Sequence, residues 1–120
     1  MALLASLSVT FVALLHIYIL ILETFLWATP RGLKAFGLPR DLALKTKALA
    51  ANQGLYNGFL AAGLAWGLLH PVPGFGRQIQ VFFLGFVVLA GVFGAVTVKG
   101  KVIFVQSVPA AVAIAAVWFA

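Results

Sequence analysis

A histidine and a glutamate lie seven positions apart in one long apolar segment near the start of the chain. They are His16 and Glu23, and Glu23 is one of only two acidic residues among 120. In a helix, 100° of rotation per residue puts both side chains on one face, about 20° apart around the axis and roughly 10 Å apart along it. Trp27 falls on the same stripe, one turn further on. Because imidazole and carboxyl groups are the usual general acids and bases, this face predicts proton transfer by His16 and Glu23, with Trp27 packing against a substrate.

Both groups also have a purely structural explanation. Glu23 would extend to the end of its helix and pair there with Arg31 or Lys99. His16 would be a neutral imidazole, hydrogen-bonded across a helix interface. Ionisable side chains inside apolar helices are costly and commonly functional. The two explanations therefore stay open side by side.

A second polar group opens the next apolar segment, in the stretch NQGLYNGFLAAG. Asn52, Gln53, Tyr56 and Asn57 spread over about 140° of a helix, which is more than one partner helix can cover. They predict a substrate-binding pocket, to which the last segment would add Gln106. The structural alternative is hydrogen bonding between helices, worth about 0.6 kcal/mol per bond in membranes.

The composition indicates that these residues belong to a membrane protein. The chain is 64% hydrophobic and 8% charged, whereas soluble domains are about half apolar and a quarter charged. A hydrocarbon core about 30 Å thick needs roughly 20 apolar residues as a helix. Four segments are long enough, at about 3–28, 48–69, 79–98 and 102–120. We therefore expect an all-α polytopic membrane protein, a compact four-helix transmembrane bundle that forms a single domain over 1–120. Two GxxxG patterns, which indicate close helix packing, are formed by Gly54 with Gly58 and by Gly63 with Gly67.

Basic residues are concentrated on one side of this predicted bundle. The first and third loops hold seven of the eight, and the second loop holds one: Arg31, Lys34, Arg40, Lys45 and Lys47; Lys99 and Lys101; and Arg77. By the positive-inside rule the first and third loops are cytoplasmic and both termini are non-cytoplasmic, in a multi-pass protein of the inner (plasma) membrane. Short basic loops between apolar segments also favour membrane lipids as partners and argue against nucleic acid.

Neither a metal nor a cofactor is expected. The chain has no cysteine, and its two histidines, His16 and His70, fall at different depths of the predicted bundle. One carboxylate beside a single histidine does not complete a metal site. Haem ligation through both histidines fails for the same reason of depth.

Two motifs resemble a known family. The pattern H-I-Y-I-x-x-x-E-x-x-x-W in the first segment and NQGLYNGFLAAGL in the second are similar to those of small bacterial four-helix membrane proteins catalogued as a domain of unknown function. The resemblance covers essentially the whole chain and implies the fold and the membrane location, with no activity attached. It also implies that the signature positions are His16, Glu23, Trp27, Asn52, Gln53, Tyr56 and Asn57.

Three functions fit these observations. The first is a membrane protein whose polar pocket binds a small apolar or lipid-like molecule, and in its enzymatic form converts it by proton transfer. The second is a small proton-coupled transporter that acts as a homodimer. The third is a structural or accessory subunit, in which the polar residues only hold helices together. Whether the protein is an enzyme is left open by the sequence.

Overall fold

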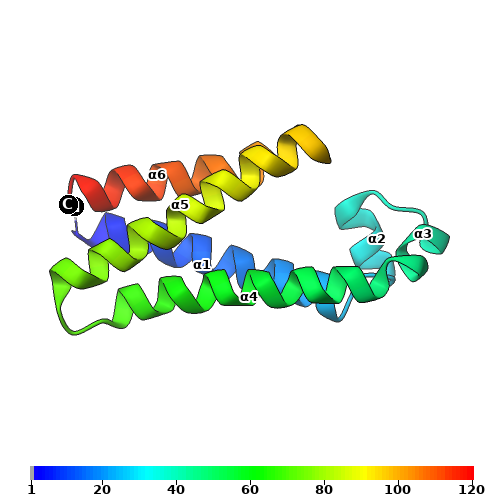
Figure 1. The fold of residues 1–120 in the computed structure, drawn as a ribbon, viewed down its shortest axis with the longest axis horizontal. Coiled ribbons are helices and arrows are strands. Elements are labelled where there is room, and N and C mark those ends of the chain that lie inside the picture. Colours follow the sequence, from blue (N-terminus) through cyan, green and yellow to red (C-terminus); the bar gives the residue numbers. More distant parts are fainter. Residues whose placement is uncertain (1) are drawn as a thin grey trace. The chain divides into compact units, whose positions relative to one another are not determined.

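The computed structural model describes residues 2–120, and within that range it contains helices and no β-strand (Figure 1). The prediction of an all-α fold is confirmed. The long helices are α1 (Ala2–Thr24), α4 (Lys47–Leu69) and α5 (Pro73–Thr97). The shorter elements are α2 (Pro30–Phe36), α3 (Arg40–Lys45), the π-helical segment η1 (Ile103–Ser107) and α6 (Val108–Trp118).

The chain divides into two compact units. The terminal unit consists of Met1–Leu14 and Leu60–Ala120, and the central unit is Leu15–Phe59. The division falls within α1 and within α4, so each of these helices contributes to both units.

Two of the helices are long and apolar enough to cross a membrane. They are α1, with 23 residues, and α5, with 25. At 1.5 Å per residue each is about 35 Å long, somewhat more than the hydrocarbon core of a bilayer. Helix α4 has 23 residues as well, but Asn52, Gln53 and Asn57 make its first half more polar. By length and composition, two helices of this chain could therefore span a membrane.

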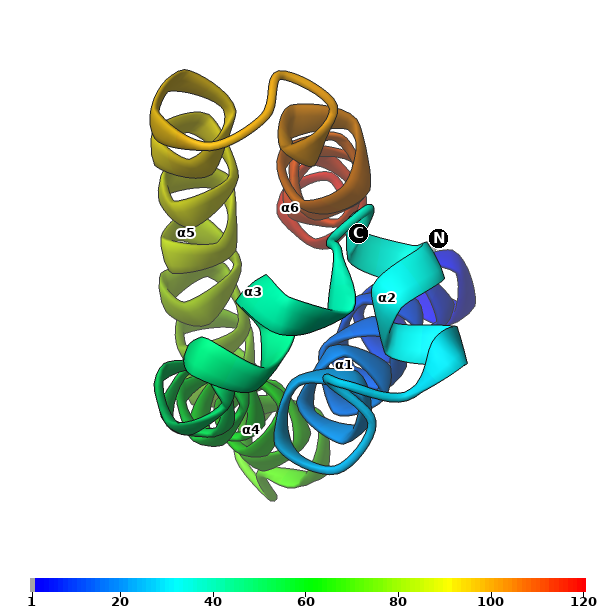
Figure 2. The same cartoon turned by 90° about the vertical axis from the view of Figure 1, so that its right-hand side faces the viewer.

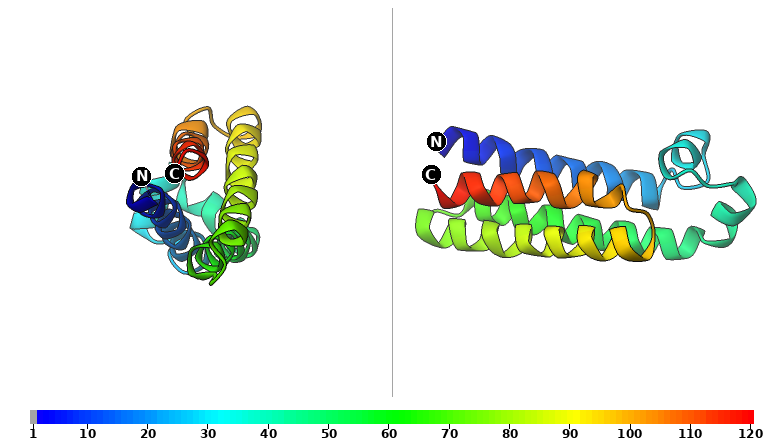
Figure 3. Two further views of the ribbon diagram at one scale, coloured as in Figure 1. Left: turned by 90° about the vertical axis from the view of Figure 1, so that its left-hand side faces the viewer. Right: turned by 90° about the horizontal axis from the view of Figure 1, so that it is seen from above.

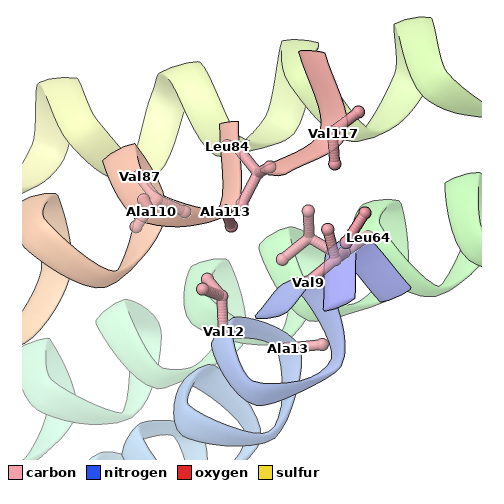
Figure 4. Packing of buried hydrophobic residues seen from close by; sticks show 10 residues of the cluster. Val9, Val12, Ala13, Leu64, Leu84, Val87, Ala110, Ala113 and Val117 are labelled. Carbon is pink, nitrogen blue, oxygen red and sulfur yellow. The ribbon is translucent and has the colours of Figure 1, made fainter. Parts of the chain in front are cut away.

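The core of the terminal unit is built from small and branched aliphatic side chains. Val9 on α1, Leu64 on α4 and Leu84 on α5 are fully buried, and Ala110 and Ala113 bring α6 close to them (Figure 4). Helix α5 and the η1–α6 segment pack against each other and run antiparallel (Figure 3). The short loop around Gly100 thus connects the two arms of a helical hairpin.

A glycine and a serine make the closest approach within this hairpin. Gly91 on α5 faces Ser107, whose hydroxyl donates a hydrogen bond to the backbone oxygen of Val88 at 2.8 Å. A Cβ atom at Gly91 would overlap the Ser107 Oγ and lie 2.8 Å from its backbone nitrogen. The π-helical turn precedes Pro109, which has no N–H to donate to a carbonyl in the preceding turn.

We expect Gly91→Ala to lower the free energy of unfolding by about 1–3 kcal/mol, because the added methyl group overpacks the hairpin. Gly85→Ala is the matched control, since a Cβ atom at Gly85 on the same helix meets nothing within 4 Å. The control should be neutral or stabilising by up to about 1 kcal/mol. The measurement is the unfolding temperature of each detergent-solubilised variant, monitored by circular dichroism. Equal unfolding temperatures in the two variants would contradict it.

The helices differ from the predicted spans at two ends. Helix α1 stops at Thr24, four residues before the predicted end of the first span, and in the turn that follows the amide of Leu26 is shared between the carbonyl oxygens of Ile21 and Leu22. Helix α5 begins at Pro73, six residues before the predicted start of the third span. Proline is well tolerated in the first turn of a helix, where its missing N–H is not needed.

The loop between α1 and α4 contains two short helices, α2 and α3. Pro30 opens α2, and Thr29 caps it by accepting a hydrogen bond from the amide of Gly32 at 3.4 Å. Gly37 ends α2 in the left-handed conformation, with φ of 65°, and α3 follows (Figure 2). Proline and glycine here mark the ends of short helices instead of excluding them.

Candidate functional site

Within the central unit, α1 and α4 approach closely where α4 carries two glycines. A Cβ atom at Gly54 would overlap the hydroxyl of Thr24, and one at Gly58 would lie 2.6 Å from the Leu20 side chain. Small residues four apart let two helix backbones come together in this way. The packing expected of this GxxxG pattern is present, and it sets which face of α4 is turned toward α1.

Glu23 and Asn57 meet at this helix contact. The Asn57 side-chain nitrogen donates a hydrogen bond to the Glu23 Oε1 at 2.6 Å and a second one to the backbone oxygen of Gln53 at 3.1 Å. Both side chains are half-buried. Within residues 2–120, no further hydrogen bond involves the second Glu23 oxygen or the Asn57 Oδ1. One oxygen atom on each side chain therefore remains able to accept a hydrogen bond from a hydroxyl or amino group.

His16 lies on α1, two turns before Glu23, and its side chain is fully buried, with 0% exposure. Because α1 is a continuous helix from Ala2 to Thr24, the predicted spacing of His16 and Glu23 on one face is preserved.

Trp27 does not share that face. It lies in the turn after α1, where its indole nitrogen donates a hydrogen bond to the Thr46 hydroxyl at 3.1 Å. Its ring packs against Phe36, with 4.8 Å between the ring centroids. The expectation of a single helical stripe that includes Trp27 was wrong, because α1 ends at Thr24 before reaching it. In the structure Trp27 joins the turn to α2 and to the start of α4.

The other predicted binding residues are not brought to Glu23 by the hydrogen bonds of the structure. Asn52, Gln53 and Tyr56 are exposed on α4, and the Tyr56 ring makes an edge contact with Phe59 at 5.6 Å. Gln53 contributes its backbone oxygen to Asn57. Gln106 belongs to η1 in the terminal unit, where its Cβ lies beside Gly91.

One contact was missed by the sequence reasoning. The Arg31 Nε donates a hydrogen bond to the Tyr18 hydroxyl at 3.3 Å, and the guanidinium group lies 5.7 Å from the centre of that ring. The turn after α1 reverses the chain and carries Arg31 back alongside the helix. The Thr29-Pro30 pair is the sequence feature that indicates this reversal, because Thr29 caps α2 and Pro30 begins it. Arg31 thus contacts Tyr18, whereas the partner of Glu23 is Asn57.

Neither a metal-binding cluster nor any of the three cavities described next includes Glu23 among the described residues. Among the described residues no group of three histidine, aspartate or glutamate side chains is placed to hold a metal ion. Three cavities are lined by residues of the terminal unit, including Arg77, Val117 and Pro109.

These features define an all-helical protein with two helices able to cross a membrane and an acid–amide pair between two of its long helices. The chain belongs to the family described as "Protein of unknown function (DUF1304)", whose model matches residues 10–118. The expectation of a family of unknown function is thereby confirmed. All the predicted site residues fall inside the matched range.

A relative supports the assignment. The chain is 27% identical over 99 residues to the "Uncharacterized protein YpaA" of Lactococcus lactis subsp. lactis (strain IL1403), a match that covers 79% of this chain and 80% of YpaA. No solved structure matches the chain.

Proposed function

We propose that this protein is a multi-pass inner-membrane protein that binds a small apolar or lipid-like molecule at the Glu23–Asn57 pair. In this proposal the four long apolar segments form one membrane domain, with both termini non-cytoplasmic and the first and third loops cytoplasmic. Helices α1 and α5 support the membrane location by length and composition, and the seven-to-one distribution of basic residues supports the orientation.

The observation that carries the proposal is the 2.6 Å hydrogen bond between Asn57 and Glu23. A carboxyl group inside an apolar helix costs free energy, and such groups commonly belong to a binding or proton-transfer site. The two remaining acceptors at the pair favour a ligand with an apolar body and one hydroxyl or amino group. In the enzymatic form of the proposal, Glu23 and His16 exchange protons with the bound molecule, while Trp27, Asn52, Gln53 and Tyr56 of the same unit contribute to binding.

We expect Glu23→Gln to lose the bound molecule. The loss of a charge-assisted hydrogen bond lowers affinity by roughly tenfold to a hundredfold. The measurement is mass spectrometry of small molecules that co-purify with the protein from its own membranes. Asp41→Asn is the matched control, because Asp41 is the other acidic residue and is exposed on α3. A co-purifying species retained equally by both variants would contradict a role for Glu23, and its loss in His16→Ala as well would support the proton-transfer form.

A structural role is the second candidate, and the glycine contact favours it. Gly54 and Gly58 bring α1 and α4 together at the level of the pair, so the Asn57–Glu23 bond would also fix their packing. On this alternative Glu23→Gln changes stability alone, with no ligand-linked effect.

The transporter alternative uses the same carboxyl group in a homodimer. It requires proton movement coupled to substrate movement in proteoliposomes, abolished in Glu23→Gln. Absence of directional transport in the wild-type protein would remove it.

A further inference from the structure

A groove of about 630 Å³ lies between the first turns of α5 and the end of α6, inside the terminal unit. Its apolar walls are Val81, Phe82, Val117 and Trp118, and Arg77 and Gln78 supply its polar side. The volume falls within the range of small-molecule sites in proteins. One side of the groove is therefore apolar and the other carries a positive charge.

Arg77 also lines a neighbouring groove of about 360 Å³, together with His70. Arg77 and Val117 line both grooves, so the two grooves adjoin at these residues.

Arg77 has no acidic side chain to neutralise it within its own unit. The two acidic residues of the chain, Glu23 and Asp41, both belong to the central unit, whereas Arg77 belongs to the terminal unit. A guanidinium group presents planar, paired donors that match the oxygens of a phosphate. Within the terminal unit, Arg77 therefore offers a positive charge and paired donors that suit an anionic group.

The apolar wall of the groove suits a ligand that joins an apolar chain to the anionic group. Phe82 and Trp118 are 60% and 71% exposed, and both flank the groove. Tryptophan is enriched at the boundary between membrane and water, where its ring contacts chains and headgroups together. A soluble phosphate would leave this apolar surface uncovered, whereas the acyl chain of a lipid would cover it.

We propose that this groove binds an anionic phospholipid, with the headgroup phosphate at Arg77 and an acyl chain along Val81, Phe82 and Trp118. The site is separate from the Glu23–Asn57 pair and shares only the membrane location with the proposed function. If the experiment contradicts one of these two proposals, the other can still be tested.

The test is native mass spectrometry of the full chain in detergent micelles, titrated with phosphatidylglycerol or with phosphatidylcholine of the same acyl chains. We expect the wild-type protein to retain phosphatidylglycerol preferentially, and Arg77→Gln to weaken this binding about fivefold, the effect of one basic residue on an anionic lipid. Lys99→Gln removes the same charge outside the groove and is expected to keep the preference. Glu23→Gln is likewise expected to keep it, which separates this site from the proposed function.

A pair of glycine variants tests the acyl chain independently of charge. Gly74 lines the groove and Gly85 lies further along α5, and a Cβ atom at either position meets nothing within 4 Å. Gly74→Leu should fill the groove and weaken retention of phosphatidylglycerol about as much as Arg77→Gln, whereas Gly85→Leu should bind like the wild-type protein.

Three results would overturn the proposal. Equal losses in Arg77→Gln and Lys99→Gln would mean general attraction to a charged surface. Unchanged binding in Gly74→Leu would place the acyl chain elsewhere. Full displacement of the lipid by glycerol 3-phosphate would assign the site to a soluble phosphate compound instead.

Discussion

Gly32→Ala is expected to lower the free energy of unfolding by about 3 kcal/mol, at the upper end of the range for overpacking. A Cβ atom at Gly32 would overlap the carbonyl oxygen of Leu26 and lie 2.6 Å from that of Trp27. Both are backbone atoms of the turn after α1, so they cannot move aside by a change of rotamer. The substitution must therefore open the turn that holds Trp27 against Thr46 and Phe36.

Two measurements separate this effect from a general loss of helix. Thermal unfolding of the detergent-solubilised protein gives the stability, and hydrogen exchange locates the change, with faster exchange expected over residues 25–46. Gly100→Ala is the control, because a Cβ atom at Gly100 meets nothing within 4 Å. If Gly32→Ala exchanged and unfolded like Gly100→Ala, the close packing of α2 on the turn would be refuted.

The second large effect is expected from Asn57→Leu. This change removes the donor to Glu23 and leaves a half-buried carboxyl group without its hydrogen bond, at a cost of roughly 1.5–3 kcal/mol. Asn52→Leu makes the same chemical change at an exposed position of the same helix and should alter stability by less than about 0.5 kcal/mol.

A double-mutant cycle with Glu23→Leu measures the interaction itself. Because the two side chains touch, their effects should be non-additive by about 1 kcal/mol or more. The cycle also separates the candidate functions: coupling in stability with no change in bound molecules favours the structural role, and loss of a bound molecule favours the binding site. Purely additive effects would show that Asn57 does not hold Glu23.

Much of the architecture followed from local sequence patterns. The apolar runs predicted the long helices to within a few residues at most of their ends, because helix formation in such segments depends on near neighbours. The Gly54–Gly58 spacing predicted close packing, and the structure places Leu20 and Thr24 against these glycines. One exception is the end of α1 at Thr24, after which the Leu26 amide is shared between Ile21 and Leu22, the chain turns, and Trp27 leaves the predicted stripe.

The candidate site likewise combines features that the sequence predicted with one that depended on the tertiary structure. By itself the sequence determined which polar side chains lie in apolar helices, and that His16 and Glu23 share one face of α1, because these properties depend on residue type and helical period. Only the tertiary structure decided that Asn57, among the four polar side chains that open α4, is the partner of Glu23. That choice depends on the rotation of α4 about its axis, which is set by the contact of its glycines with α1. This contact joins residues thirty or more positions apart, and no local pattern encodes it.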